Sequence, residues 1–160
     1  MKLKKPLLVT MLMVGSIVAL PDFSFSQIKI IQFEQIDSLQ RIEKRNVAVF
    51  IHTDWCKYCQ TMQNTTFKND SIIKVLNDKF YFIDLNAEEK RNVIFNNHTF
   101  KFKPTGANTG THELADQLGT VNNKISYPTL CFLNADSEII FQYNQSINVK
   151  DLQLILTRLK

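Results

Sequence analysis

Hydrophobic and polar residues follow one another along this chain in a pattern that predicts an α/β domain. Residues 34–45 carry apolar side chains three or four positions apart, the spacing of an amphipathic helix. The continuous apolar run at 47–51 suits a strand covered on both faces of a largely parallel sheet. The other expected elements are a helix from about Lys57, a helix capped by Asp70 or Ser71, strands at 80–85, 128–133 and 138–143, and a last helix capped by Asn148.

The order of these elements indicates how they are arranged. The short polar link at 134–137 predicts that the last two strands form an antiparallel hairpin. Helices alternate with strands in the first half of the chain, which is typical of parallel pairing. The sequence therefore predicts a central mixed β-sheet flanked by helices.

A segment at about 92–119 interrupts this order and carries Asn, Gly, Thr, Pro and His between short patterned pieces. Within it, residues 99–103 alternate in polarity and predict a strand. Residues 113–118 predict a short helix closed by Gly119. We expect one domain over 27–160 with an insertion at 92–119, before the strand that begins at Pro128.

The first 26 residues have the pattern of a secretory signal peptide. Three lysines come first, and an apolar run of about 14 residues follows, shorter than the roughly 20 that cross a bilayer. Ser24 and Ser26 have the spacing of a cleavage site before Gln27. We expect a periplasmic or secreted protein, and contact with a membrane only if this segment stays uncleaved as an anchor.

Net charge narrows the choice of partners. Nineteen basic residues stand against fifteen acidic ones, and half of that excess lies in the first 26 residues. The remaining near-neutral domain has no basic footprint for nucleic acid, so we expect none as a partner. It also has no obvious apolar surface stripe, which favours a monomer.

Cysteine is the residue type that points to chemistry. Three cysteines are too few for a fold held together by disulfides, and their odd number suggests a working pair with one left over. Cys56 and Cys59 stand three apart, directly after the apolar strand and at the start of a helix. Helix-start amides stabilise a thiolate, and Lys57 adds positive charge nearby. Cys56 is therefore the expected attacking thiolate, and the more buried Cys59 the resolving thiol. A structural disulfide or half of a zinc site is the alternative.

The run Asp54-Trp55-Cys56-Lys57-Tyr58-Cys59 resembles the active site of the thioredoxin superfamily, and Tyr127-Pro128-Thr129 fits its second motif. The resemblance is to secreted bacterial thioredoxin-like proteins, those of the Bacteroidetes among them. It implies a thioredoxin-like fold in which Pro128 is cis opposite the first cysteine and the backbone of Tyr127 pairs with substrate. Trp55, Lys57 and Tyr58 are implied to support the site.

Two departures from the family pattern concern proton transfer and the insertion. Thioredoxins usually bury an acidic residue six positions before the first cysteine, and here that position is Phe50. The partner lysine of the next strand is also missing from residues 80–83. His52, four residues before Cys56, is a candidate for proton transfer and equally for simple packing. The insertion precedes Pro128 and is a candidate for shaping substrate choice.

Five other residues have more modest expected roles. Asp54 is expected to cap the helix or to form local hydrogen bonds. Trp55 is expected to pack beside the sulfurs and shield them, so that it belongs partly to the core and partly to the site. Cys131 lies within an apolar strand and is expected to be a buried structural residue. His98 and His112, both in the insertion, are weak candidates for copper or zinc ligands together with the cysteine pair.

These observations predict a thiol–disulfide oxidoreductase that needs no cofactor. Its expected partners are proteins with disulfides or dithiols and a redox partner protein, with the direction of electron flow left open. The alternative is a non-catalytic thioredoxin-fold binding module, or a copper or zinc carrier, that uses the cysteine pair as a ligand or redox sensor.

Overall fold

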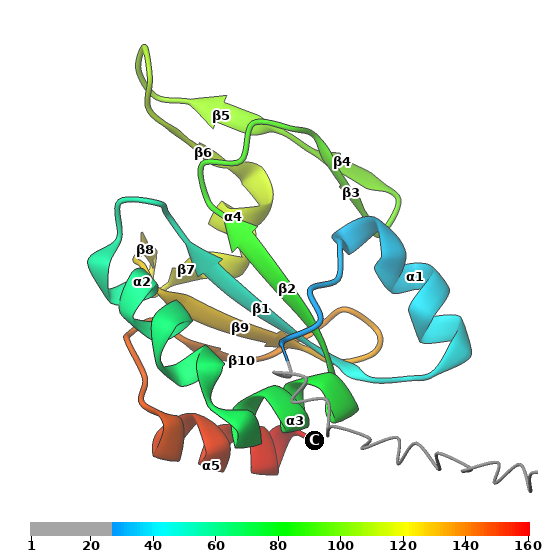
Figure 1. Cartoon of the computed structure of the whole chain (residues 1–160). Coiled ribbons are helices and arrows are strands. Elements are labelled where there is room, and N and C mark those ends of the chain that lie inside the picture. Colours follow the sequence, from blue (N-terminus) through cyan, green and yellow to red (C-terminus); the bar gives the residue numbers. More distant parts are fainter. Residues whose placement is uncertain (1–26) are drawn as a thin grey trace, which may run out of the picture.

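The computed structural model describes residues 27–160 as a four-stranded sheet with helices on both faces and small hairpins beyond one end (Figure 1). The expected signal peptide at 1–26 lies outside the described residues. Within 27–160, no helix has the length and apolar character needed to cross a membrane. The helices are α1 Phe33–Ile42, α2 Lys57–Asn64, η1 Thr66–Lys68, α3 Asp70–Lys79, α4 Glu113–Gly119 and α5 Val149–Leu159. The strands are β1 Asn46–His52, β2 Phe80–Asn86, β3 Val93–Phe95, β4 His98–Phe100, β5 Phe102–Pro104, β6 Gly110–His112, β7 Thr120–Val121, β8 Lys124–Ile125, β9 Thr129–Leu133 and β10 Ile139–Tyr143.

The central sheet has the strand order β10-β9-β1-β2. β1 runs parallel to β2 and antiparallel to β9, and β9 and β10 form the expected antiparallel hairpin. The prediction of a mixed sheet flanked by helices is therefore confirmed. In this register Phe50 of β1 lies opposite Asp84 of β2.

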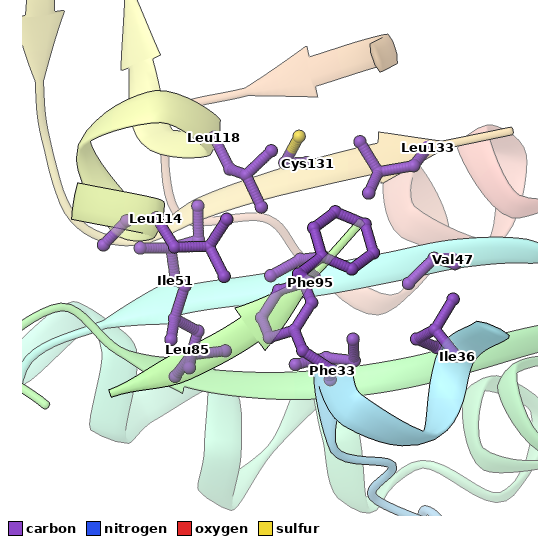
Figure 2. Close-up of a cluster of buried hydrophobic side chains, with 14 of the residues drawn as sticks. Phe33, Ile36, Val47, Ile51, Leu85, Phe95, Leu114, Leu118, Cys131 and Leu133 are labelled. Carbon is purple, nitrogen blue, oxygen red and sulfur yellow. The ribbon is translucent and has the colours of Figure 1, made fainter. Parts of the chain in front are cut away.

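Alternate residues of β1 face two separate apolar layers. Val47, Val49 and Ile51 belong to a cluster that α1, β3 and α4 cover, seen in Figure 2. Ala48 and Phe50 belong to a second cluster on the other face, which α2, α3 and α5 cover. This second layer contains both Cys56 and Cys59, so the redox pair is part of one of the two cores.

The helices begin close to the expected positions, with differences at the caps. Asn69, and not Asp70 or Ser71, caps α3, because its side chain accepts the backbone N–H of Ser71. Asn148 caps α5 as predicted. Gly119 is the last residue of α4, but its backbone is not left-handed, so it does not form the expected glycine cap. It allows close packing, since a Cβ there would lie 3.3 Å from Cδ1 of Ile51.

The segment expected to be an insertion contains two hairpins and α4, and a third hairpin follows. The single strand expected at 99–103 is wrong: the chain breaks at Lys101 into β4 and β5, which pair with β3 and β6. The strand breaks at Lys101 because the backbone of this residue pairs with Glu113. The amide of Lys101 donates to the Glu113 carboxylate, and its carbonyl accepts the backbone N–H of Glu113. The β3–β4 and β7–β8 turns each contain two asparagines at positive φ, the signature of tight hairpin turns.

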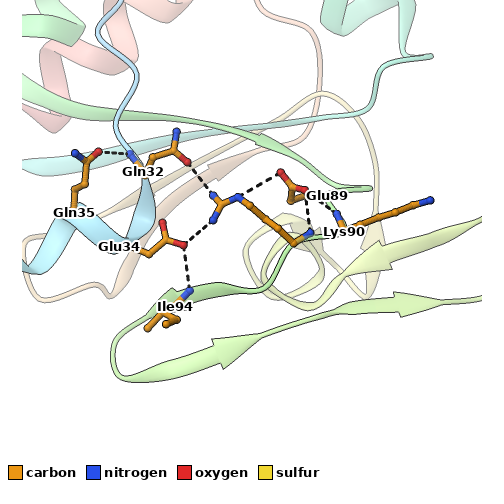
Figure 3. A network of polar contacts seen from close by, with 7 residues as sticks. Gln32, Glu34, Gln35, Glu89, Lys90 and Ile94 are labelled. Atoms are coloured by element: carbon orange, nitrogen blue, oxygen red, sulfur yellow. Dashed lines mark hydrogen bonds and ion pairs between the residues drawn. The ribbon is translucent and has the colours of Figure 1, made fainter.

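Arg91 ties the start of this segment to α1, in the polar network of Figure 3. Its guanidinium donates to Glu34 at 2.7 Å and to Gln32 at 2.9 Å, and it lies 3.6 Å from Glu89. These side chains are partly exposed, so the network orients the segment more than it stabilises it.

Residues 27–31 run beside the outer side of β2. The amide of Ile31 donates to the carbonyl of Phe82 at 2.8 Å, next to a parallel bridge between Ile30 and Phe82. Asn77 of α3 holds the same segment through Gln27 and Lys29. The first residues of the described chain are therefore part of the fold.

Candidate active site

The start of α2 places the two cysteines of the Cys-x-x-Cys motif in one turn. Cys56 and Cys59 are joined by a disulfide, with their Cα atoms 5.3 Å apart. Cys56 is the N-cap of α2, and its Sγ accepts the backbone N–H of Cys59 at 3.1 Å. A backbone amide placed in this way at a helix start favours a thiolate on Cys56 when the disulfide is reduced.

Burial distinguishes the two sulfurs. Cys59 is fully buried, whereas Cys56 is 5% exposed, so the expectation that Cys59 is the more buried of the two is confirmed. Lys57 and Tyr58, between them, are exposed, Tyr58 at 69%. A partner therefore meets Cys56 first, with Cys59 beneath it.

Asp54 does not cap the helix, contrary to one expectation, because Cys56 occupies the cap position. Its Oδ1 instead accepts the side-chain N–H of Asn86 at 3.0 Å, and its carbonyl accepts from Gln60. Asp54 thus joins the end of β1 to the end of β2.

Trp55 lies at the surface and not partly in the core as expected. It is 65% exposed, and its Nε1 donates to Oε1 of Glu88 at 3.2 Å. Its ring meets Tyr127 edge-on, with centroids 6.0 Å apart. Sequence interpretation missed Glu88, whose only signal in the sequence is its place just after β2.

The second predicted motif comes to the same place. The Tyr127–Pro128 peptide bond is cis, and Tyr127 packs against the cluster that contains Cys56 and Cys59. Burial raises the pKa of the Tyr127 hydroxyl, although a hydrogen bond with Thr111 acts in the opposite direction. Since Thr111 belongs to β6, the insertion contributes to the surroundings of Tyr127.

A histidine–aspartate pair lies at the ends of β1 and β2. Phe50 is buried at the position where the family pattern has an acid, and the ring of His52 stacks on it at 5.3 Å. His52 Nε2 lies 2.9 Å from Oδ1 of Asp84. Sequence reasoning named His52 but missed Asp84, whose signal was a lone acidic residue within an apolar strand.

The structure separates the remaining candidates from the cysteine pair. His112 is fully buried and caps α4, its Nδ1 accepting the N–H of Leu114. His98 is exposed beside Phe100. Residues 27–160 contain no group of three or more His, Cys, Asp or Glu placed to hold a metal ion. Cys131 is free and fully buried, and burial raises its pKa to about 12.

Comparisons with known proteins agree with this geometry. The model of the thioredoxin-like domain family matches residues 33–160. DsbH oxidoreductase superposes with a TM-score of 0.61 at 12% identity, over 91% of this chain and 93% of that chain. A thioredoxin from Thermus thermophilus gives 0.58 at 18% identity, over 82% and 86%. A protein described as a putative disulphide-isomerase from Bacteroides thetaiotaomicron gives 0.57 at 18%, over 82% and 92%. No curated protein sequence matches the chain.

A Cys-x-x-Cys disulfide at a helix start, with a cis-proline motif packed beside it, defines a thiol–disulfide oxidoreductase of thioredoxin-like fold. The match over 33–160 shows that this chain belongs to the thioredoxin-like domain family. The narrower resemblance to Bacteroidetes proteins stays a prediction.

Proposed function

We propose that this protein exchanges disulfides with other proteins outside the cytoplasm. The observation that carries the proposal is the Cys56–Cys59 disulfide, in which the slightly exposed sulfur sits at the helix start and the buried sulfur lies behind it. The exposed side chains of Trp55 and Tyr58 beside this pair offer a protein partner an apolar contact surface.

The exchange follows from the order in which the two sulfurs are reached. The Cys56 thiolate attacks a substrate disulfide, so a bond forms between Cys56 and one substrate sulfur while the other leaves as a thiolate. Cys59 then loses its proton and attacks Cys56, which forms the internal disulfide and releases the second substrate sulfur. Two electrons and two protons pass to the substrate; in the oxidising direction each step runs in reverse.

Trapping of the mixed disulfide tests this mechanism. Cys59→Ser and Cys56→Ser are made in a Cys131→Ala background, so that each protein has one cysteine. Incubated with an extract of extracytoplasmic proteins, Cys59→Ser should accumulate partners that dithiothreitol releases, and Cys56→Ser should accumulate none. An absence of trapped partners on Cys59→Ser, or equal trapping on both variants, contradicts the proposal.

The direction of electron flow follows from the reduction potential of the pair. Potentials in this fold span roughly −270 to −120 mV, from reductant to oxidant. Equilibration with glutathione buffers gives the value, and insulin reduction run alongside it measures reductase turnover. A pair that cannot be cycled between dithiol and disulfide would refute the oxidoreductase function and favour the binding module.

Location outside the cytoplasm rests on the sequence pattern of residues 1–26. Expression of the full chain in a bacterium, followed by fractionation and N-terminal sequencing, tests it. We expect a mature protein that begins at Gln27 in the periplasmic or secreted fraction. An unprocessed chain in the cytoplasmic fraction contradicts this part of the proposal.

A further inference from the structure

His52 lies on the same face of the sheet as the resolving cysteine. Along β1, Ala48 and Phe50 face the apolar layer that contains Cys59, and alternation puts His52 next in this row. Its ring stacks on Phe50 with an interplanar angle of 16°. Figure 1 shows that the end of β1 leads into α2, so His52 is the residue of this row that is closest along the chain to the cysteine pair.

The surroundings of His52 suit it to holding a proton. Burial by itself lowers the pKa of His52, but the contact with Asp84, the Thr53 backbone and the charge of Asp54 together outweigh it, so that the pKa is raised. Nε2 lies 2.9 Å from Oδ1 of Asp84, so the carboxylate stabilises the ring once it has taken up a proton. The His52 carbonyl accepts the N–H of Ala87 at 2.7 Å, which fixes the strand end.

The pair also has a route to solvent. Phe50 and Asp84 line a groove of about 270 Å³ between residues 27–30, the end of α2 and η1. Lys68 of η1 is the charged side chain that lines it beside Asp84. The Asp84 side chain is 27% exposed, compared with 11% for His52. The carboxylate of Asp84 therefore connects the buried histidine with this groove.

The other buried ionisable side chains within 27–160, outside the cysteine pair, lie on the opposite face of the sheet. The half-buried Tyr127 packs against both clusters, but burial raises its pKa, so its hydroxyl stays protonated at neutral pH and cannot accept a proton. Tyr81 and Cys131 belong to the cluster that α1 and α4 cover. His112 caps α4 itself. On the Cys59 face, the buried ionisable side chain of the described chain that can serve the resolving thiol is His52.

We propose that the His52–Asp84 pair takes up the proton of Cys59 when the mixed disulfide is resolved, and returns it in the reverse reaction. This inference rests on the proposed oxidoreductase function and assigns one of its steps. The proton leaves Sγ of Cys59 through water and binds a ring nitrogen of neutral His52, while Asp84 stabilises the imidazolium. Cys59 Sγ then bonds to Cys56 Sγ, and the substrate thiolate departs and takes a proton from solvent.

Transient kinetics separate this step from the first attack. The reduced protein is mixed with increasing glutathione disulfide, and the fluorescence of Trp55 is followed. At high glutathione disulfide the observed rate reaches a limit set by Cys59, whereas iodoacetamide alkylation reports Cys56 alone. Asp84→Asn and His52→Gln each remove one member of the pair. Asp78→Asn is the control, because it removes a carboxylate of α3 whose ion pair with Lys74 is exposed and whose charge does not act on His52.

We expect Asp84→Asn and His52→Gln to lower the limiting rate at pH 7 by about tenfold, less than the roughly 10²–10⁴-fold typical of general acid–base catalysis. In the wild type the rate should rise with pH through an inflection above 6.5, which His52→Gln should lose. Alkylation of Cys56 should change by less than about threefold, and Asp78→Asn should match the wild type.

Wild-type limiting rates and pH profiles in either folded variant would overturn the inference. Asp84 is partly exposed, so Asp84→Asn is expected to fold even if His52→Gln does not. Absence of any reaction between wild-type Cys56 and glutathione disulfide would instead refute the proposed function, so the two failures are distinguishable.

Discussion

We predict that the insertion is held on the domain by the apolar side of α4 and not by the Arg91 network. Leu114 is 1% exposed and packs in the cluster that faces α1, as Figure 2 shows. Leu114→Ala removes three carbons, worth about 0.8 kcal/mol each in transfer. The cavity left behind raises the loss in the free energy of unfolding to about 3 kcal/mol, within the roughly 2–5 kcal/mol typical of such changes.

Arg91→Gln provides the comparison at the other attachment. The guanidinium, Glu34 and Glu89 are 45%, 34% and 36% exposed, so solvent screens their attraction. We expect a loss of about 0.2–1 kcal/mol, smaller still in high salt. Both variants keep the hydrogen bond from the backbone amide of Leu114 to Nδ1 of His112, since neither substitution removes the donor or the acceptor.

Urea unfolding of the oxidised proteins at pH 7 gives the two losses, and amide hydrogen exchange shows where they act. Leu114→Ala should speed exchange in β5 and β6 far more than Arg91→Gln does. A loss for Arg91→Gln equal to or larger than that for Leu114→Ala would refute this account of how the insertion is attached.

Three further predictions concern single residues. Burial lowers the pKa of His112 in the folded protein, so the unfolded chain binds more protons than the folded one. The contribution of His112 to the free energy of unfolding is therefore complete above about pH 6.5, and it is lost as the pH falls through the folded-state pKa. Urea unfolding at pH 7.5 and 5 should therefore show a smaller acid loss for His112→Gln than for wild type, and equal losses would contradict this. Burial raises the pKa of Cys131 to about 12, so Cys131 should resist iodoacetamide at pH 8 in the folded oxidised protein and should be alkylated after unfolding in urea. Mass spectrometry measures the added mass, and alkylation of the folded protein would contradict this prediction. Asn148→Ala should cost about 1 kcal/mol by calorimetry, because Oδ1 caps the Asp151 N–H at 3.0 Å, and Asn148→Ser should recover most of it.

The sequence was sufficient to predict the main elements and the reactive pair, because these depend on local patterns. A continuous apolar run and a Cys-x-x-Cys pair at a helix start are legible without tertiary contacts. The mixed sheet followed from a short turn between two strands. The cis bond before Pro128 was expected from the family resemblance alone, and the structure confirms it.

The partners of the site residues could not be predicted, because they come from strand register. Asp84 reaches His52 only because β1 and β2 pair with Phe50 opposite Asp84. The exposed indole of Trp55 donates to Glu88, which lies 33 residues further on. The turns at 96–97 and 122–123 carried a readable local signal, paired asparagines, and there the interpretation missed what the sequence offered.

The segment at 27–31 also has a consequence for solubility. A sheet whose outermost strands lack partners presents free amides and carbonyls that recruit strands from other molecules. Here the contact between Ile31 and Phe82 occupies part of that row beside β2, and on the opposite side β10 is irregular between Ile139 and Phe141. Both features hinder edge-to-edge association. A chain shortened to begin at Phe33 would keep the Cys56–Cys59 pair yet expose β2, and we expect it to aggregate more readily than the longer protein.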